Sequence, residues 1–326
     1  MCPLWRVCQP LCRWLLHQKS AGNKTRKKGR VRRMGAMIKK IRLKGHETFI
    51  LREGWLTKGL AAAEKDGTVF SKNSGADALG VGTNMAKAIR YWMQSAGFIG
   101  KTENRAAVKL ELLGQLVYQK DPYFEDDFSY WLVHMNLVTN AEAVTSWYLF
   151  FNTLQAEEFT RTELEDYMLR EYAVETGRTE IPRRSLADDC SAILRMYSRD
   201  HVEDYDPEDK SISPFAHLGL LKLDGGKYRK SQPNLNRLSS FAVWYLIEKM
   251  WEENKTNSIS IASLLEDAKG PGKVLQLKRA ALNEYLDKLD NYGYIRLNRT
   301  AGLDMVYKNE EKKRGPYEVA ELYYEK

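Results

Sequence analysis

The sequence lacks long apolar runs, and it has few cysteines outside its first 36 residues. No window approaches the ~20 uninterrupted apolar residues of a membrane-spanning helix, which argues against an integral membrane protein. Cys190 is the single cysteine beyond residue 36. One cysteine provides no intrachain disulfide framework, so the composition favours a reducing environment. We therefore expect a soluble, cytoplasmic protein.

Signature motifs of the familiar enzyme classes are also absent. There is no GxxxxGK phosphate loop, no paired CxxC zinc motif and no GxSxG nucleophile elbow. The pair His46-Glu47 is not followed by a second histidine at the spacing of an HExxH zinc motif. These absences argue against the enzyme classes that the motifs define, and they leave function to be sought in local residue patterns.

Acidic side chains are missing from residues 1–36, which contain ten Lys or Arg residues. The rest of the chain has 41 basic and 43 acidic residues, so the net charge of +8 comes from this leader. We interpret the leader as disordered or as an over-extended start, with translation beginning near Met34 or Met37. A phosphate-binding tail and a weak secretion signal are alternatives. Nucleic-acid binding by the rest of the chain must therefore rest on local patches.

A helix-turn-helix pattern is present in residues 75–101, GADALGVGTNMAKAIRYWMQSAGFIGK. A short first helix and a Gly-rich turn precede a second helix, whose apolar residues recur at intervals of three and four. These residues are Met85, Ala86, Ile89, Trp92, Met93 and Ala96. Gly97 then ends the helix and Phe98-Ile99 begins a strand. This order predicts a winged helix-turn-helix unit.

The same order recurs near the C-terminus, where residues 293–295 (Gly-Tyr-Ile) align with residues 97–99 (Gly-Phe-Ile). A weaker copy lies between them. It has a helix in IPRRSLADDCSAILRMYS and a hairpin turn at Asp224-Gly225-Gly226. The aromatic-rich stretch at residues 121–154 is expected to form buried helices.

The predicted fold class is therefore mainly α with small β-wings, arranged as repeated winged helix-turn-helix units on an aromatic helical scaffold. The predicted divisions are the basic leader 1–36, an N-terminal winged-helix unit 37–120, a helical middle region with a hairpin wing 121–235, and a C-terminal winged-helix unit 236–326.

The polar side of the second helix in the N-terminal unit is the first candidate DNA contact. Asn and Gln hydrogen-bond adenine edges, Arg binds guanine or phosphate, and Lys reaches phosphate. The predicted contacts are Asn84, Lys87, Arg90, Tyr91 and Gln94 on this helix, with Lys101 and Arg105 on the wing. The alternative is a solvated face on a unit that binds another protein.

Two other basic regions are weaker candidates. The C-terminal copy has acidic residues along its helix and should act in packing, although Arg296 and Arg299 lie in its wing. The most basic stretch outside the leader is KYRKSQPNLNR, residues 227–237, which either follows a phosphate backbone or forms a solvated loop. Its candidate contacts are Lys227, Arg229, Lys230 and Arg237.

A polar stretch at residues 44–66, KGHETFILREGWLTKGLAAAEKD, precedes the first predicted helix. His46 and Glu47 suit an acid–base pair or half of a metal site. Glu53 would lie in the first helical turn, where a carboxylate favours the helix dipole. The alternative is a structured loop in which Arg52 pairs with Glu47 or Asp77. The acids that could approach this stretch in space are Asp126, Asp127, Asp188 and Asp189.

Several of these residues resemble a known family. The runs HETF (46–49), LREGWL (51–56), LGVG (79–82) and IRYW (89–92) resemble a bacterial family of unknown-function domains, found in operons for single-stranded DNA phosphorothioation. The chain looks like the SspB-type subunit of these systems. The likeness begins near Lys40 and does not cover residues 1–36. It departs at Ile50, where the family is expected to have a proline.

The resemblance implies a strand-nicking, DNA-binding subunit that prepares DNA for sulfur insertion. It implies three partners besides DNA: a cysteine desulfurase, an ATPase and a PAPS-reductase-like protein. His46 and Glu47 would then act in acid–base catalysis or bind a divalent metal such as Mg²⁺ or Mn²⁺, Arg52 would hold phosphate, and Glu53 would support them. The alternative is a non-catalytic winged-helix regulator or adaptor. The recognised DNA sequence, the metal and the oligomeric state stay open.

Overall fold

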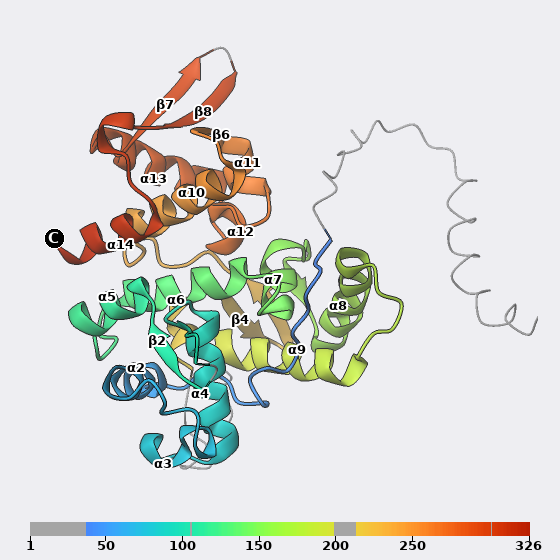
Figure 1. Ribbon diagram of the computed structural model, residues 1–326. Helices are drawn as coiled ribbons and strands as arrows, with labels where there is room; N and C mark the ends of the chain where they lie inside the picture. The colour runs from blue at the N-terminus through green and yellow to red at the C-terminus, as the bar shows by residue number, and fades with distance from the viewer. Residues whose placement is uncertain (1–36, 105, 199–212, 301) are drawn as a thin grey trace, which may run out of the picture. The chain divides into compact units, whose positions relative to one another are not determined.

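The computed structural model describes residues 37–104, 106–198, 213–300 and 302–326. The predicted leader 1–36 and Arg105 lie outside these residues. The described chain is mainly α-helical with three small antiparallel sheets, which confirms the predicted class at this level (Figure 1). Within it, no helix combines the length and the apolar character that crossing a membrane requires.

The first part of the described chain contains a two-stranded hairpin between helices. Its elements are α2 Trp55–Lys65, η3 Asn73–Gly75, α3 Ala76–Leu79, α4 Thr83–Ser95, β1 Ile99–Lys101, β2 Val108–Leu110 and α5 Leu112–Lys120. Ile99 of β1 faces Leu110 of β2. On the outer side of β2, the Val108 N–H donates to the carbonyl of Gly67 at 2.7 Å. The segment before η3 thus supplies one strand-like contact to this hairpin.

The middle part forms a three-stranded sheet from strands on either side of two helices. Its elements are α6 Asp127–Thr139, α7 Thr145–Asn152, β3 Glu158–Phe159, α8 Arg161–Thr176, α9 Arg183–Tyr197, η4 Pro214–Leu218, β4 Leu221–Asp224 and β5 Lys227–Lys230. β5 lies between β3 and β4. Gly225 and Gly226 have φ of 55° and 78° at the β4–β5 turn, as a tight hairpin requires, so the predicted hairpin is confirmed.

The C-terminal part repeats this strand order. Its elements are α10 Ser240–Asn254, β6 Ser258–Ser260, α11 Ile261–Glu266, α12 Pro271–Val274, α13 Arg279–Asn291, β7 Ile295–Thr300, β8 Leu303–Lys308, η5 Glu310–Lys312 and α14 Pro316–Tyr324. β8 lies between β6 and β7 (Figure 1). In the same way, β5 lies between β3 and β4. In both parts, the strand before the helices pairs with the last strand of the hairpin.

The ends of α4 and α13 have the same geometry. Gly97 and Gly293 adopt φ of 74° and 69°, which glycine adopts without the steric cost of a Cβ atom. The next residue closes each helix in the same way, since Phe98 N–H donates to Met93 and Tyr294 N–H donates to Leu289. The predicted correspondence of residues 97–99 with residues 293–295 is therefore confirmed as a local structure.

Aromatic side chains fill the core. Trp92, Trp147, Trp244 and Trp251 are almost fully buried. In the stretch 121–154, α6 and α7 bury most of their residues, as predicted from its aromatic content. The buried apolar residues form one contiguous cluster that extends from the first part of the described chain to α14. Residues 37–326 consequently behave as one compact unit.

Gly114 allows α5 to pack directly against the backbone at Phe98. A Cβ atom at this position would lie 2.2 Å from the Phe98 carbonyl oxygen. We expect Gly114→Ala to lower the free energy of unfolding by about 1–3 kcal/mol, because backbone must shift to accept the methyl group. Leu112→Ala on the same helix is the control, since Leu112 is 61% exposed. Equal chemical denaturation midpoints for the two variants would contradict this packing argument.

Candidate functional site

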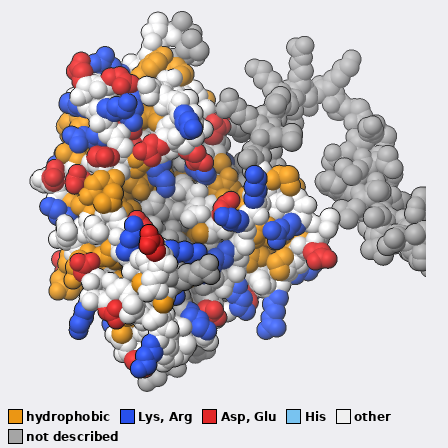
Figure 2. All heavy atoms as spheres, viewed as in Figure 1, with side chains coloured by type: hydrophobic (Ala, Val, Ile, Leu, Met, Phe, Trp, Pro, Cys, Tyr) orange, Lys and Arg blue, Asp and Glu red, His pale blue; other side chains and the backbone are white. Residues whose placement is uncertain are grey.

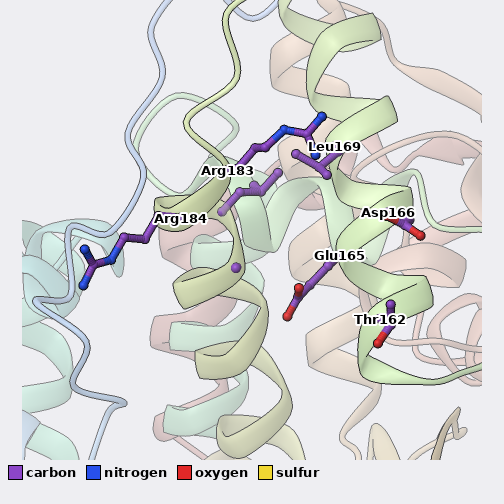
Figure 3. Close-up of a pocket in the computed structure, with 8 residues that line it drawn as sticks. Thr162, Glu165, Asp166, Leu169, Arg183 and Arg184 are labelled. Atoms are coloured by element: carbon purple, nitrogen blue, oxygen red, sulfur yellow. The ribbon is translucent and has the colours of Figure 1, made fainter. Parts of the chain in front are cut away.

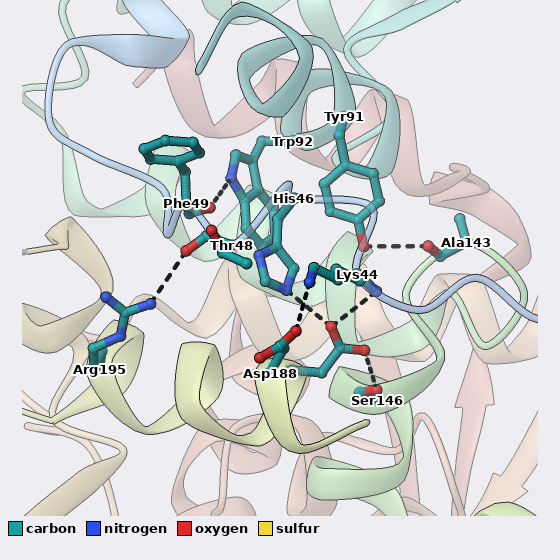
Figure 4. A network of polar contacts seen from close by, with 11 residues as sticks. Lys44, His46, Thr48, Phe49, Tyr91, Trp92, Ala143, Ser146, Asp188 and Arg195 are labelled. Atoms are coloured by element: carbon teal, nitrogen blue, oxygen red, sulfur yellow. Dashed lines mark hydrogen bonds and ion pairs between the residues drawn. The ribbon is translucent and has the colours of Figure 1, made fainter. Parts of the chain in front are cut away.

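Residues 37–54, which we term the strap, cross over α7 and α9 and are fixed there by Asp189. This buried carboxylate accepts hydrogen bonds from the Lys44 backbone N–H at 2.9 Å and from His46 Nε2 at 2.9 Å. Its other oxygen accepts from Ser146 Oγ at 2.6 Å (Figure 4). Asp189 therefore joins α9 to the strap and to α7.

Aromatic rings enclose His46, whose exposure is 0%. Its ring stacks on Trp92 at 5.8 Å between centroids and meets the edge of Trp147 at 5.6 Å. Trp92 Nε1 in turn donates to the Phe49 carbonyl at 3.2 Å. His46 Nδ1 is buried without a hydrogen-bond partner. In this conformation a phosphodiester could reach the imidazole only if the strap moved.

The strap backbone is strained beside His46. Lys44, Glu47 and Thr48 have φ of 55°, 50° and 71°, a region that costs non-glycine residues free energy. The surrounding contacts hold them there. Lys44 Nζ pairs with Asp188 at 2.7 Å, and Arg195 donates to the Thr48 carbonyl at 3.2 Å.

The four predicted catalytic residues do not form a bonded set. No hydrogen bond or ion pair between described residues joins His46 to Glu47, Arg52 or Glu53. Arg52 lies over the rings of Phe49 and Trp55 at 5.8 and 5.5 Å. The expected ion pair of Arg52 with Glu47 or Asp77 is wrong, because a cation–π contact takes its place. The catalytic roles themselves stay predictions.

The first helix begins later than the sequence indicated. α2 starts at Trp55 with Gly54 as its N-cap, so Glu53 precedes the first turn instead of lying in it. Glu53 acts electrostatically on Tyr130 of α6, where burial and this nearby carboxylate raise the pKa of the phenol to about 12. Of the four acids considered as neighbours of the polar stretch, Asp189 contacts His46 and Asp188 contacts Lys44.

The polar side of α4 is open over its first turns. Asn84 and Lys87 are exposed, whereas Arg90 and Gln94 are half-buried. Lys87 Nζ donates to Asn84 Oδ1 at 3.2 Å, and the Arg90 guanidinium lies 5.7 Å from the centre of the Phe70 ring. α4 contains no acidic residue. Its accessible side therefore combines positive charge with hydrogen-bonding amides.

Tyr91 is not on that side, which corrects the predicted exposure. Its ring is 2% exposed, and its hydroxyl donates to the Ala143 carbonyl at 3.3 Å. The Arg42 guanidinium of the strap lies over the ring at 4.5 Å. Burial raises the pKa of this phenol. Tyr91 is buried because the strap and the loop before α7 cover a second side of α4.

The basic residues of the two predicted wings differ in their surroundings. Lys101 is exposed at the end of β1. Lys227 and Arg229 both pair with Glu158, at 3.3 and 2.7 Å. These contacts are exposed, so they leave the predicted DNA-binding role untested.

Lys230 and Arg237 are engaged more firmly. Lys230 Nζ donates to the carbonyls of Phe150 and Leu154 at 3.1 and 2.9 Å, and burial lowers the pKa of its ammonium to about 7. Arg237 makes two hydrogen bonds to Asp127, at 2.7 and 2.8 Å. The solvated-loop alternative thus fails for Lys230, which satisfies carbonyls at the end of α7.

The helices that correspond to α4 in the other two parts are less accessible or less basic. The strap covers α9 through Asp188, Asp189 and Arg195. α13 carries Glu284, Asp287 and Asp290. Of these three helices of the described chain, α4 is the one that contains no acidic residue, whereas α9 contains Asp188 and Asp189. On the face shown in Figure 2, basic and acidic side chains are interspersed, which agrees with the near-neutral charge outside the leader.

A shallow groove of about 310 Å³ lies between α8 and α9, with Leu169 and Leu186 at its walls. Glu165 and Asp166 line it from α8, and Arg183 and Arg184 from α9, although Arg184 points away from the α8 side chains (Figure 3). The described residues contain no cluster of three or more His, Cys, Asp or Glu side chains arranged to hold a metal ion. We therefore assign no metal ligands.

Fold and site together define a mainly helical protein with small antiparallel sheets, in which the accessible side of α4 is basic and free of acids. The chain belongs to the family described as Protein of unknown function (DUF4007), whose model matches residues 43–324. This confirms the family that the sequence resembled. No curated protein matches the chain significantly.

Two solved structures share the fold. A magnesium ion-bound SspB crystal structure has a TM-score of 0.76 and 24% identity, covering 87% of this chain and 88% of that chain. A second SspB crystal structure has a TM-score of 0.75 and 23% identity, with the same coverage of both chains.

Proposed function

We propose that the protein is a DNA-binding component of a bacterial DNA phosphorothioation system, and that it docks α4 against duplex DNA. Its family and the fold that it shares with SspB support the phosphorothioation context. The observation that carries the DNA-binding proposal is the exposed side of α4, which has Lys and Arg side chains and no acid.

We also propose that the three helix-and-hairpin parts are winged helix-turn-helix units. In such units the second helix enters the major groove and the hairpin lies beside the backbone. The strand order β3-β5-β4 and β6-β8-β7 supports this assignment for two of them. In the first, α4 would be the recognition helix and the β1–β2 hairpin the wing.

The side chains of α4 suit both backbone and base contacts. Lys87 and, on the wing, Lys101 would bind phosphates, which fixes register without reading sequence. Arg90 would bind guanine or phosphate, and Asn84 and Gln94 would bind adenine edges. Tyr91 is left out of this proposal because it is buried.

Strand nicking is the finer part of the proposal. The protein would cut one strand for a cysteine desulfurase, an ATPase and a PAPS-reductase-like protein in the cytoplasm. His46, Glu47, Arg52 and Glu53 stay the proposed catalytic residues, and the buried position of His46 means that the strap would have to open. Mg²⁺ would stabilise the negative charge that develops at the phosphate. Mg²⁺ commonly binds through one or two carboxylates and the substrate phosphates, so it does not require a large cluster of protein ligands.

Duplex affinity tests the role of α4. We expect Lys87→Ala/Arg90→Ala to weaken binding of a labelled duplex by roughly 10- to 100-fold and to reduce the salt slope by about 0.9 for each phosphate that is no longer neutralised. Fluorescence anisotropy at several salt concentrations measures both. The control is Lys58→Ala/Lys65→Ala, which removes two exposed charges from α2.

Equal loss of affinity in both double variants would show that net charge acts without docking of α4. Unchanged affinity in the α4 variant would favour the protein-binding adaptor. Plasmid nicking with Mg²⁺ or Mn²⁺ separates the remaining alternatives, because a regulator would bind DNA and leave the plasmid supercoiled.

A further inference from the structure

At the end of α13, a row of aromatic rings in contact extends from the core to the surface. Buried Trp244 of α10 stacks on Tyr294, with centroids 4.3 Å apart and planes 16° apart. Tyr294 lies 5.9 Å from Tyr292, which is 58% exposed. The fold thus presents a tyrosine ring to solvent on a rigid aromatic base.

Two lysine ammonium groups lie on the same rings. Lys326 Nζ lies 4.3 Å from the centroid of Phe241, 5.2 Å from that of Tyr292 and 5.5 Å from that of Tyr294. Lys312 Nζ lies 5.5 Å from the centroid of Tyr294 and donates to the Tyr292 carbonyl at 3.1 Å. Among the described residues, no carboxylate forms an ion pair with either lysine. Two ammonium groups are therefore held beside an exposed ring without an ion-pair partner among the described residues.

Three carboxylates of the C-terminal part are engaged elsewhere. Glu325 is exposed beside Lys326, and Lys326 as the last residue of the sequence also carries an α-carboxylate, so these two negative charges balance the two lysines in net charge. The engaged acids are Asp287, held by Arg299; Asp290, held by the Leu297 N–H; and Glu311, held by Arg296. The surface formed by Tyr292, Lys312 and Lys326, which we term the tyrosine platform, therefore offers an exposed aromatic ring with two ammonium groups beside it, without an excess of positive charge.

We propose that the tyrosine platform binds a single-stranded nucleic acid, with a base stacked on Tyr292 and phosphates beside Lys312 and Lys326. Aromatic rings flanked by cations bind unpaired strands because every base has a π-face and every nucleotide a phosphate. A duplex hides its base faces, so this surface suits a strand that has been opened or nicked. The proposal rests on the proposed DNA-processing function and adds a second contact, in a different part of the chain from α4.

An acidic peptide would also be attracted to the two lysines, but it would make no use of the exposed ring. Stacking on Tyr292 is therefore the property that distinguishes the two ligands. A Tyr292→Leu variant keeps apolar bulk and both lysines, and it removes the flat aromatic face together with the phenol hydroxyl.

Binding of a labelled oligothymidylate of about 12 nucleotides to the full chain tests the platform, since one single-strand-binding module covers about 4–16 nucleotides. We expect Tyr292→Leu to weaken this binding about tenfold, equivalent to ~1.4 kcal/mol, and to leave duplex binding unchanged. Lys326→Ala should reduce the single-strand salt slope by about 0.7. The control Lys313→Ala removes an exposed lysine that contacts none of these rings and should change neither value.

Wild-type affinity in Tyr292→Leu, or no oligothymidylate binding by the wild-type chain, would overturn the proposal. Equal competition by poly-glutamate would also overturn it, because an anion site without stacking would explain the result. Failure of the α4 proposal is distinguishable, since it appears as unchanged duplex binding in Lys87→Ala/Arg90→Ala while the effect of Tyr292→Leu on the single strand persists.

Discussion

Asp189→Ala is expected to lower the free energy of unfolding by about 3–5 kcal/mol, as for other buried charged networks that lose one member. The variant leaves the Lys44 N–H, His46 Nε2 and Ser146 Oγ without the acceptor that they share. A buried donor without a partner keeps its desolvation penalty. Urea or guanidinium denaturation measures the change, and amide hydrogen exchange over the strap shows whether it loosens first.

Asp188→Ala is the matched control, one position away on the same helix. Its ion pair with Lys44 joins side chains that are about a third exposed. Pairs of this kind contribute about 0–1 kcal/mol, so the control should lose little stability. Similar losses in the two variants would contradict a specific role for Asp189. Fast strap exchange only in Asp189→Ala would support it.

The same network bears on the proposed nicking role of His46. Strain at Lys44, Glu47 and Thr48 favours release of the strap, whereas Asp189 opposes it. If His46 acts on a phosphodiester, weakening this attachment should expose it and raise nicking activity in proportion to strap exchange. If His46 only anchors the strap, loosening should leave nicking unchanged.

The parts of the fold that the sequence predicted well are those in which neighbouring residues determine the structure. The ends of α4 and α13 follow from a glycine in the left-handed region and an apolar residue after it. The β4–β5 hairpin follows from Gly225 and Gly226. In these cases, short-range backbone geometry and the periodicity of apolar residues are sufficient.

What the sequence could not predict concerns residues whose surroundings come from distant parts of the chain. Tyr91 lies beside the stripe that the apolar period predicts, but a carbonyl 52 positions away and the strap bury it. From the sequence, Lys230 could be a solvated cation, but in the structure its ammonium donates hydrogen bonds to backbone carbonyls 76 and 80 positions earlier. His46 finds its partner 143 positions away. No local pattern encodes such pairings, so only the tertiary structure shows which polar residues are buried.

Another buried histidine provides a pH-dependent test of the core. Tyr197 donates to His134 Nδ1 at 2.8 Å, and His134 Nε2 donates to the Val274 carbonyl at 2.8 Å. The carbonyl only accepts, so the neutral ring carries its proton on Nε2. Burial lowers the pKa of His134 from 6.5 to about 4. Between these values the unfolded chain binds a proton at this residue that the folded chain does not.

Stability should therefore be retained above pH 6.5 and should fall as the pH drops towards 4, with His134 accounting for about 3 kcal/mol of the loss. Carboxyl groups elsewhere in the chain also titrate in this range, so the slope of the wild-type protein is compared with that of His134→Gln. The Gln amide can accept a hydrogen bond from Tyr197 and donate one to Val274, and it does not titrate. We expect the variant to lose some stability at pH 7 and to show a slope between pH 6.5 and 4 that is shallower by this amount. Denaturation midpoints at half-unit pH intervals give both slopes. Parallel profiles of stability against pH for the two proteins would contradict this prediction. The protons would then be accepted by other groups, and His134 would either ionise within the fold or become exposed before the chain unfolds.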